Sequence, residues 1–224
     1  MKGSLVAVVL VLVVAATSLG QTLFTGSGEF SGTAVLRFTK TSVTAELDGA
    51  LRLSGVLPIE DAAVSLEAEG EIVGAGEGDM ASLTGVAWMT FVGRGTLQNG
   101  EDVAVCGGLT ADDGDFLISV DAEGEGTGRF FLMILSARTR YEFAGSTRGV
   151  TAGSFVPPDD PSTMQLMMLG TMEFASTSSV SHLRSDPVEA ETLQQRLPWD
   201  LGTWPSELAA YLVDFLVGSS SETK

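Results

Sequence analysis

The sequence predicts a mainly β protein, an antiparallel β-sandwich or open β-barrel, followed by two short C-terminal helices. Three observations lead to this prediction. Apolar and polar residues alternate along several segments, turn-forming pairs recur at short intervals, and glycine is concentrated before residue 180. The chain has 27 glycines, yet only Gly202 and Gly218 follow Val180, where the pattern becomes typical of helices.

The clearest alternation covers residues 62–72, where Leu66 and Ala68 are separated by Glu67 and followed by Glu69. Successive side chains of a strand point to opposite faces, so this pattern predicts one apolar face and one charged face. Residues 116–122 repeat the pattern and predict a second strand of the same kind.

Pairs of Asp or Asn with Gly predict the turns between strands. Asp48-Gly49 separates two apolar alternating segments, and such a pair suits the two-residue turn of a hairpin. Asn99-Gly100 and Asp113-Gly114 are further predicted turns, and the glycines of residues 124–128 are interpreted in the same way.

Two segments have less ordinary patterns. Residues 129–137 (RFFLMILSA) are apolar at every position but the first and the serine, which predicts a central strand covered on both sides. Residues 161–174 fit either a short helix opened by Ser162 and Gln165 or a strand. Because the alternation continues past Gly170, we favour a strand that begins at Met164.

The Ser-rich stretch 176–181 divides the chain into a β domain at 21–178 and a helical segment at 179–224, which ends in a polar tail. The sequence Asp186-Pro187-Val188-Glu189 has a capping-box arrangement and predicts a helix that ends before Pro198. Ser206 is a suitable N-cap for a second helix that Gly218 ends. We expect this segment to pack on the β domain through its apolar face, which comprises Leu208, Tyr211, Leu212, Phe215 and Leu216.

Residues 1–20 have the pattern of a cleaved export signal. Lys2 is followed by an apolar run at 5–16, and Ser18 and Gly20 provide small residues before a cleavage site. The run would span about 18 Å as a helix, which is shorter than a hydrocarbon core of about 30 Å. We therefore expect an exported protein, periplasmic, cell-surface or extracellular, with no membrane span after cleavage. A bacterial envelope fits this expectation.

The chain is strongly acidic, with 12 Lys and Arg against 29 Asp and Glu and a net charge of −17. Such a charge repels nucleic acids and anionic membrane surfaces, so nucleic acid is not an expected partner. It keeps the protein in solution, and it favours cations or basic partners.

No motif for catalysis is present. Cys106 and His182 are the only thiol and imidazole, so an intrachain disulfide is excluded and a zinc site of the usual kind is disfavoured. We interpret Cys106 as a buried strand residue and not as the nucleophile of a Cys-His pair. The hydrolase and phosphate-loop motifs G-x-S-x-G, H-E-x-x-H and G-x-x-x-x-G-K-[ST] are also missing. We expect no enzymatic activity and no cofactor.

Two sets of residues are candidates for binding. Asp112, Asp113 and Asp115 crowd one predicted turn and offer oxygen ligands for calcium, although solvated turn residues are the simpler interpretation. Met133 and Met168 lie in apolar segments, where thioethers either fill a core or adapt to an apolar ligand.

The sequence therefore predicts an exported, non-enzymatic binding or cell-surface protein. One version of this prediction is a protein that holds a small apolar ligand inside the β domain. The first alternative is a structural subunit of the cell envelope, joined through sheet edges. Lys40 is the only lysine in the β domain, so few lysines protect those edges. The second alternative is a hydrolase that uses paired carboxylates.

Overall fold

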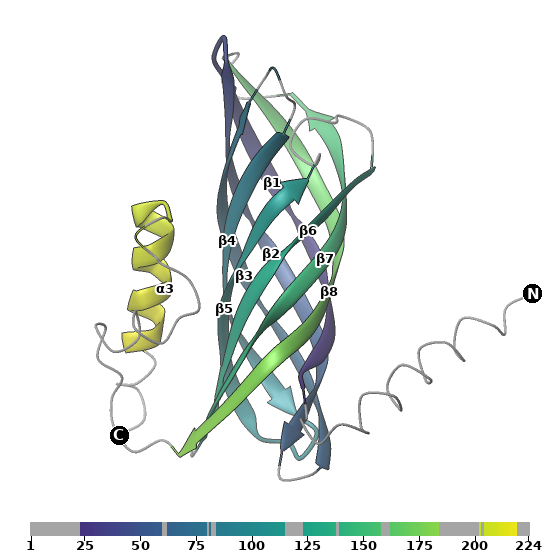
Figure 1. The fold of residues 1–224 in the computed structure, drawn as a ribbon, viewed down its shortest axis with the longest axis vertical. Coiled ribbons are helices and arrows are strands. Elements are labelled where there is room, and N and C mark those ends of the chain that lie inside the picture. The colour runs from purple at the N-terminus through teal and green to yellow at the C-terminus, as the bar shows by residue number, and fades with distance from the viewer. Residues whose placement is uncertain are drawn as a thin grey trace, which may run out of the picture.

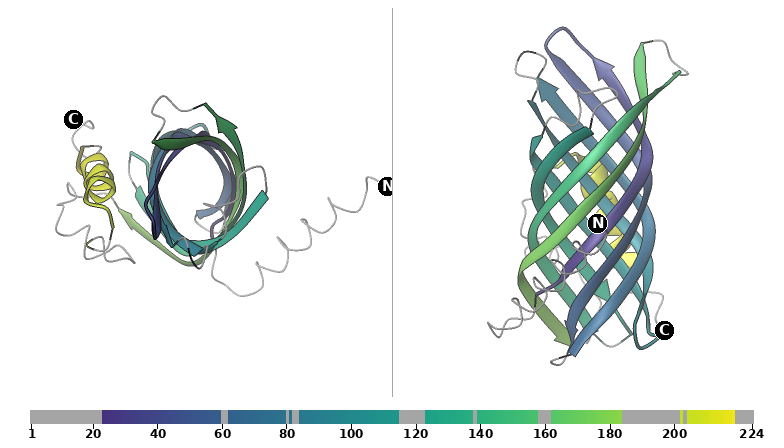
Figure 2. Two further views of the ribbon diagram at one scale, coloured as in Figure 1. Left: turned by 90° about the horizontal axis from the view of Figure 1, so that it is seen from above. Right: turned by 90° about the vertical axis from the view of Figure 1, so that its right-hand side faces the viewer.

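The computed structural model describes residues 23–59, 62–79, 81, 84–114, 123–137, 139–157, 162–183, 202 and 204–218. Eight antiparallel strands form a closed barrel in which each strand pairs with the next, and the last pairs with the first (Figures 1 and 2). The strands are β1 Thr25–Phe38, β2 Ser42–Ile59, β3 Ala62–Asp79, β4 Thr84–Leu97, β5 Asp102–Gly114, β6 Glu123–Leu135, β7 Thr139–Val156 and β8 Thr163–Leu183. One helix, α3 Ser206–Gly218, lies outside the barrel.

Closure into a ring distinguishes this fold from the sandwich or open barrel that the sequence predicts. β1 pairs along nearly its whole length with the first part of β8, from Thr25 opposite Ala175 to Arg37 opposite Thr163. The predicted export segment, the strand at 116–122 and the helix before Pro198 lie outside the described residues.

The alternation in the sequence corresponds to the inside and outside of the barrel. On β3, Leu66 and Ile72 are buried in the interior core, whereas Glu67 and Glu69 are exposed on the outer surface. The same alternation places apolar side chains inside along every strand. This confirms the prediction of one apolar and one charged face, with the hydrophobic effect as the main driving force for closure.

Several predicted turns are wrong, because their glycines lie within long strands. Asp48 and Gly49 are in the middle of β2, where Gly49 is opposite Gly32 of β1. Gly126 and Gly128 belong to β6. These glycines allow close approach of neighbouring strands, since a Cβ on Gly49 would collide with the carbonyl oxygen of Ser31. Asp113 and Gly114 are the last residues of β5, and the residues that follow them lie outside the described part of the chain, so that predicted turn is not tested.

The turn at Asn99-Gly100 is confirmed. Gly100 has a φ of 81°, which glycine adopts without strain, and its N–H donates to the carbonyl oxygen of Leu97 at 2.8 Å. The tight connection between β4 and β5 follows directly from these two residues.

β6 is buried on both faces, as its apolar sequence predicts. Phe130, Leu132 and Ile134 point into the barrel core, whereas the residues between them point outward. The outward side chains form a second cluster with residues of α3 and of the turn before it, made of Val92, Cys106, Phe131, Met133, Leu135, Trp204, Leu208 and Leu212.

α3 lies against β3, β4 and β5, and the views in Figures 1 and 2 agree on this position. It begins at Ser206 and ends at Gly218, where the sequence predicts the second helix. Within the part of the chain described here, no helix has the length and apolar character needed to cross a bilayer.

β8 settles the assignment of residues 161–174, because it begins at Thr163 and confirms the strand interpretation. It also continues through the Ser-rich stretch to Leu183, so the β structure extends beyond the boundary placed at residue 178.

Candidate ligand-binding site

Aromatic side chains fill one end of the barrel. The rings of Phe24 and Phe143 have centroids 5.4 Å apart, and those of Phe130 and Phe174 have centroids 5.2 Å apart in an edge-to-face arrangement. Phe24 also contacts Phe130. These four rings pack together beside the start of β1 and the middle of β8.

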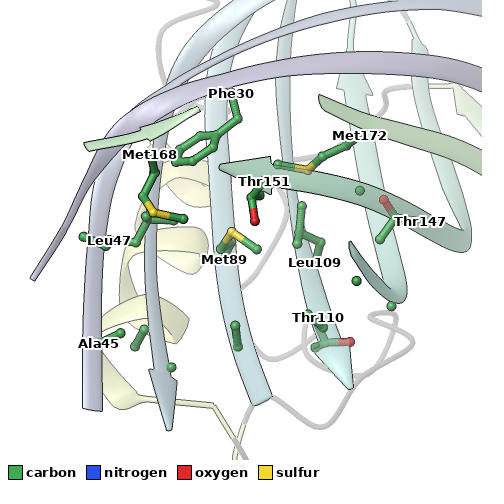
Figure 3. A pocket seen from close by; sticks show the side chains of 18 of the residues that line it. Phe30, Ala45, Leu47, Met89, Leu109, Thr110, Thr147, Thr151, Met168 and Met172 are labelled. Carbon is green, nitrogen blue, oxygen red and sulfur yellow. The ribbon is translucent and has the colours of Figure 1, made fainter. Parts of the chain in front are cut away.

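A cavity lies in the half of the interior that is nearer the connection between β1 and β2. Figure 3 shows side chains that line it. Its volume is about 80 Å³. The cavity exists because inward positions in this half carry small residues on consecutive strands. These residues are Ala34, Ala45, Gly76, Ala87, Ala111, Gly126, Gly128 and Gly149.

Three methionines, Met89, Met168 and Met172, line the cavity together with Phe30 and Leu109 (Figure 3). An apolar cavity of about 150 Å³ is large enough to hold benzene. The space present here is smaller, so a ligand of that size requires side chains to move. Methionine is unbranched and adaptable, which makes these three residues the side chains best suited to do so.

The side chains that line the cavity include no charged group. Among the polar ones, Thr147 and Thr151 are at inward-facing positions of β7. The Oγ1 atoms of Thr110 and Thr147 are buried and have no hydrogen-bond partner among the described residues. The cavity is therefore an apolar chamber with few polar atoms.

The two methionines predicted from the sequence separate in space. Met168 lines the cavity. Met133 faces outward on β6, where it is buried beneath α3 and contributes to the second cluster. Only Met168 is thus placed to contact a molecule inside the barrel.

The three candidate calcium ligands stay a prediction, because they lie only partly within the described residues. Asp112 and Asp113 lie at the end of β5, where the pairing with β6 shifts between Ala111 and Asp113. Asp115 lies outside the described residues. Within those residues, no group of three or more His, Cys, Asp and Glu side chains is arranged to hold a metal ion.

Cys106 is fully buried on the outer face of β5. Burial raises the pKa of its thiol well above the ordinary value, and the charge of Glu142 raises it further. His182 lies on β8, and β6 and β7 separate that strand from β5. The burial of Cys106 places its thiol in an unreactive environment.

Glu142 belongs to a buried ion pair on the outer face of β7. Its Oε1 lies 2.8 Å from Nε of Arg140, and both side chains are about nine-tenths buried. Met133 lies opposite both Cys106 and Glu142, which explains how the carboxylate affects the thiol. The pair neutralises two charges beside an apolar cluster, so it has a structural role.

No protein-family model and no curated protein matches the chain. Among solved structures, the chain has a faint similarity to one described as "Solid-state NMR structure of outer membrane protein AlkL in DMPC lipid bilayers". The identity is 11%, the match covers 75% of this chain and 94% of that one, and the TM-score is 0.21. A similarity at this level supports no conclusion about fold or function.

Most of the cavity was not predicted from the sequence. Met168 was a candidate, but Thr147, Met89 and the small residues were not. The pattern that would have indicated them is a run of inward Gly and Ala positions, repeated at the same height on neighbouring strands. Recognising that pattern requires the strand register.

Proposed function

We propose that this protein is an exported, non-enzymatic binding protein that holds a small apolar molecule inside its barrel. The observation that carries the proposal is the cavity above the phenylalanine cluster, which is lined by apolar and small residues. Transfer of an apolar molecule from water into such a space is favourable in proportion to the area removed from water. An eight-stranded barrel is wide enough to enclose one small ligand.

The outer surface supports a protein that works in water. The outward positions of β1 and β2 carry charged side chains such as Arg37 and Glu46, which form an exposed ion pair at 2.6 Å. Glu69 on β3 is also largely exposed. The interior is apolar, whereas the exterior carries these charged side chains together with exposed apolar ones such as Val150, Met167 and Leu169. A core filled with apolar side chains differs from the polar lumen of membrane-spanning barrels. Together with the predicted export signal, this supports a carrier in a periplasmic, cell-surface or extracellular environment.

The two alternative functions have less support. Each of the eight described strands pairs with a neighbour on both sides, so the barrel has no free edge for an assembly joined edge to edge. A hydrolase of the paired-carboxylate type needs two acids facing its substrate. No Asp or Glu is among the described residues that line the cavity.

The proposal is tested by adding benzene to protein labelled with ¹³C at the methionine methyl groups. We expect the methyl resonances of Met89, Met168 and Met172 to shift in a saturable manner. Met133 is an internal control, because it is buried on the opposite side of the sheet and should not respond.

Replacement of either of two alanines on β2 by leucine provides a matched pair of variants for this test. Ala45 lines the cavity, whereas Ala50 is exposed on the outer surface. We expect Ala45→Leu to fill the cavity and abolish the methionine shifts, and Ala50→Leu to leave them unchanged. Shifts that are absent in the unmodified protein, or that include Met133 equally, would contradict the proposal.

A further inference from the structure

We propose that the ligand of this cavity is uncharged and carries a polar group that hydrogen-bonds to the hydroxyl of Thr147. The inference rests on the proposed function, because it concerns the molecule that the cavity holds. It starts from one buried atom. Thr147 is only 8% exposed, lines the cavity, and has no hydrogen-bond partner for its Oγ1 within the described part of the chain.

An unpartnered hydroxyl is unusual in this position, because most buried polar side-chain atoms in proteins have a hydrogen-bond partner. Desolvation of such a group destabilises the folded protein unless a partner is supplied. A ligand with a hydrogen-bonding group would supply it at the moment of binding.

The neighbours of Thr147 explain why the protein itself offers no partner. Gly128 lies directly opposite on β6, and Phe174 lies opposite on β8. The next inward positions on β7 are Gly145 and Gly149, on either side of Thr147. None of these four residues has a polar side chain, and the three glycines leave the space around the hydroxyl unfilled.

The lining of the cavity has no charged side chain among the described residues, which indicates an uncharged ligand. No described side chain that lines the cavity is Lys, Arg, His, Asp or Glu. Burying an ionised carboxylate or ammonium group without a charged partner is strongly unfavourable. A hydroxyl or carbonyl group of the ligand, in contrast, needs only the hydrogen bond that Thr147 is able to make.

A second buried hydroxyl provides a matched control. Ser176 on β8 is 4% exposed, and its Oγ also has no partner among the described residues. It lies opposite Gly145 but is not among the residues that line the cavity. Substitution of Ser176 therefore removes a similar atom without removing a contact to the ligand.

The experiment compares benzene, phenol and benzoate as probes of similar shape, with affinities measured from the methionine methyl shifts. Thr147→Val preserves the shape of the side chain and removes the hydroxyl. We expect this variant to bind phenol about fivefold more weakly than the unmodified protein, while its affinity for benzene stays within about twofold. Ser176→Ala should leave both affinities unchanged, and benzoate should not bind.

The outcomes separate the inference from the proposed function. If neither benzene nor phenol binds the unmodified protein, the proposed function fails and the inference fails with it. If benzene binds but Thr147→Val affects phenol no more than benzene, the cavity binds ligands and the role of Thr147 is overturned. If benzoate binds as tightly as phenol, the inference that the ligand is uncharged is overturned. Retained benzene binding shows that Thr147→Val is folded.

Discussion

Inward-facing glycines allow neighbouring strands to approach closely in this barrel. Gly70 on β3 and Gly93 on β4 lie opposite each other, and a Cβ on Gly93 would collide with the carbonyl oxygen of Glu69. Gly32 and Gly49 form a similar pair between β1 and β2. Glycine is required at these positions by the neighbouring backbone and not by a turn.

Gly93→Ala should lower the free energy of unfolding by about 1–3 kcal/mol, because the added methyl group forces two strands apart. Gly149→Ala is the comparison, since its Cβ would meet the Thr171 carbonyl oxygen at 3.1 Å and Cγ of the flexible Met172 side chain at 3.4 Å. We expect a smaller loss there. Urea unfolding of both variants gives the values, and equal stability of Gly93→Ala and the unmodified protein would contradict the steric argument.

The wrong turn prediction at Asp48-Gly49 shows what the local sequence cannot distinguish. An Asp-Gly pair between alternating segments is typical of a hairpin turn. Here the same pair lies in mid-strand, because Gly49 accommodates the backbone of β1. The local sequence is compatible with both structures, and only the neighbouring strand distinguishes them. Thr147 was missed for a related reason, since its lack of a partner depends on Gly128 and Phe174 of the two neighbouring strands.

At the scale of single elements, the sequence predicted α3 more accurately than the strands. Ser206 and Gly218 delimit the helix, and Leu208 and Leu212 form its buried face. The position of the helix is set by the apolar outer surface of β4, β5 and β6, which it covers. One hydrogen bond adds to this packing, because the hydroxyl of Tyr211 donates to Oε2 of Glu71 at 3.0 Å.

This hydrogen bond predicts a pH dependence. Burial, followed by the hydrogen bond and charge of Glu71, raises the pKa of Tyr211 from 10.0 to about 12. Because the raised pKa belongs to the folded state, the stabilisation is complete below pH 10 and is lost as the pH rises through about 12. Packing of α3 should therefore weaken at strongly alkaline pH.

The chain has two tyrosines, so a Tyr141→Phe background leaves Tyr211 as the only phenol. Its ionisation is then followed by ultraviolet absorbance. Glu71→Gln removes the negative charge and should lower the midpoint, whereas Glu69→Gln on the same strand should not. A midpoint that is insensitive to Glu71→Gln would show that the hydrogen bond does not determine the pKa.

At the scale of the whole molecule, closure removes the sheet edges on which an edge-joined assembly depends. The β1–β8 ladder completes the ring, and α3 covers one apolar cluster of the outer surface, while Met167 and Leu169 on β8 remain exposed. The net charge of −17 adds repulsion between copies.

We therefore expect a monomer at micromolar concentration in size-exclusion chromatography with light scattering. The measurement should be made at physiological ionic strength, where the Debye length is about 8 Å. Salt then screens the charge repulsion, so the contact surfaces determine whether the protein dimerises. A stable dimer under those conditions would indicate an interface that the closed barrel does not explain, and would favour the assembly alternative.

The sequence by itself determined the two ends of α3, and it determined that a strand such as β3 has one apolar and one acidic face. These properties follow from periodicity and capping, which depend on residues close together in the chain. The tertiary structure decided the closure of the sheet and the existence of the cavity. Both depend on register between strands that are distant in sequence, such as Phe30 of β1 opposite Gly170 of β8. Only that register places small residues at one height around the barrel, with Thr147 among them.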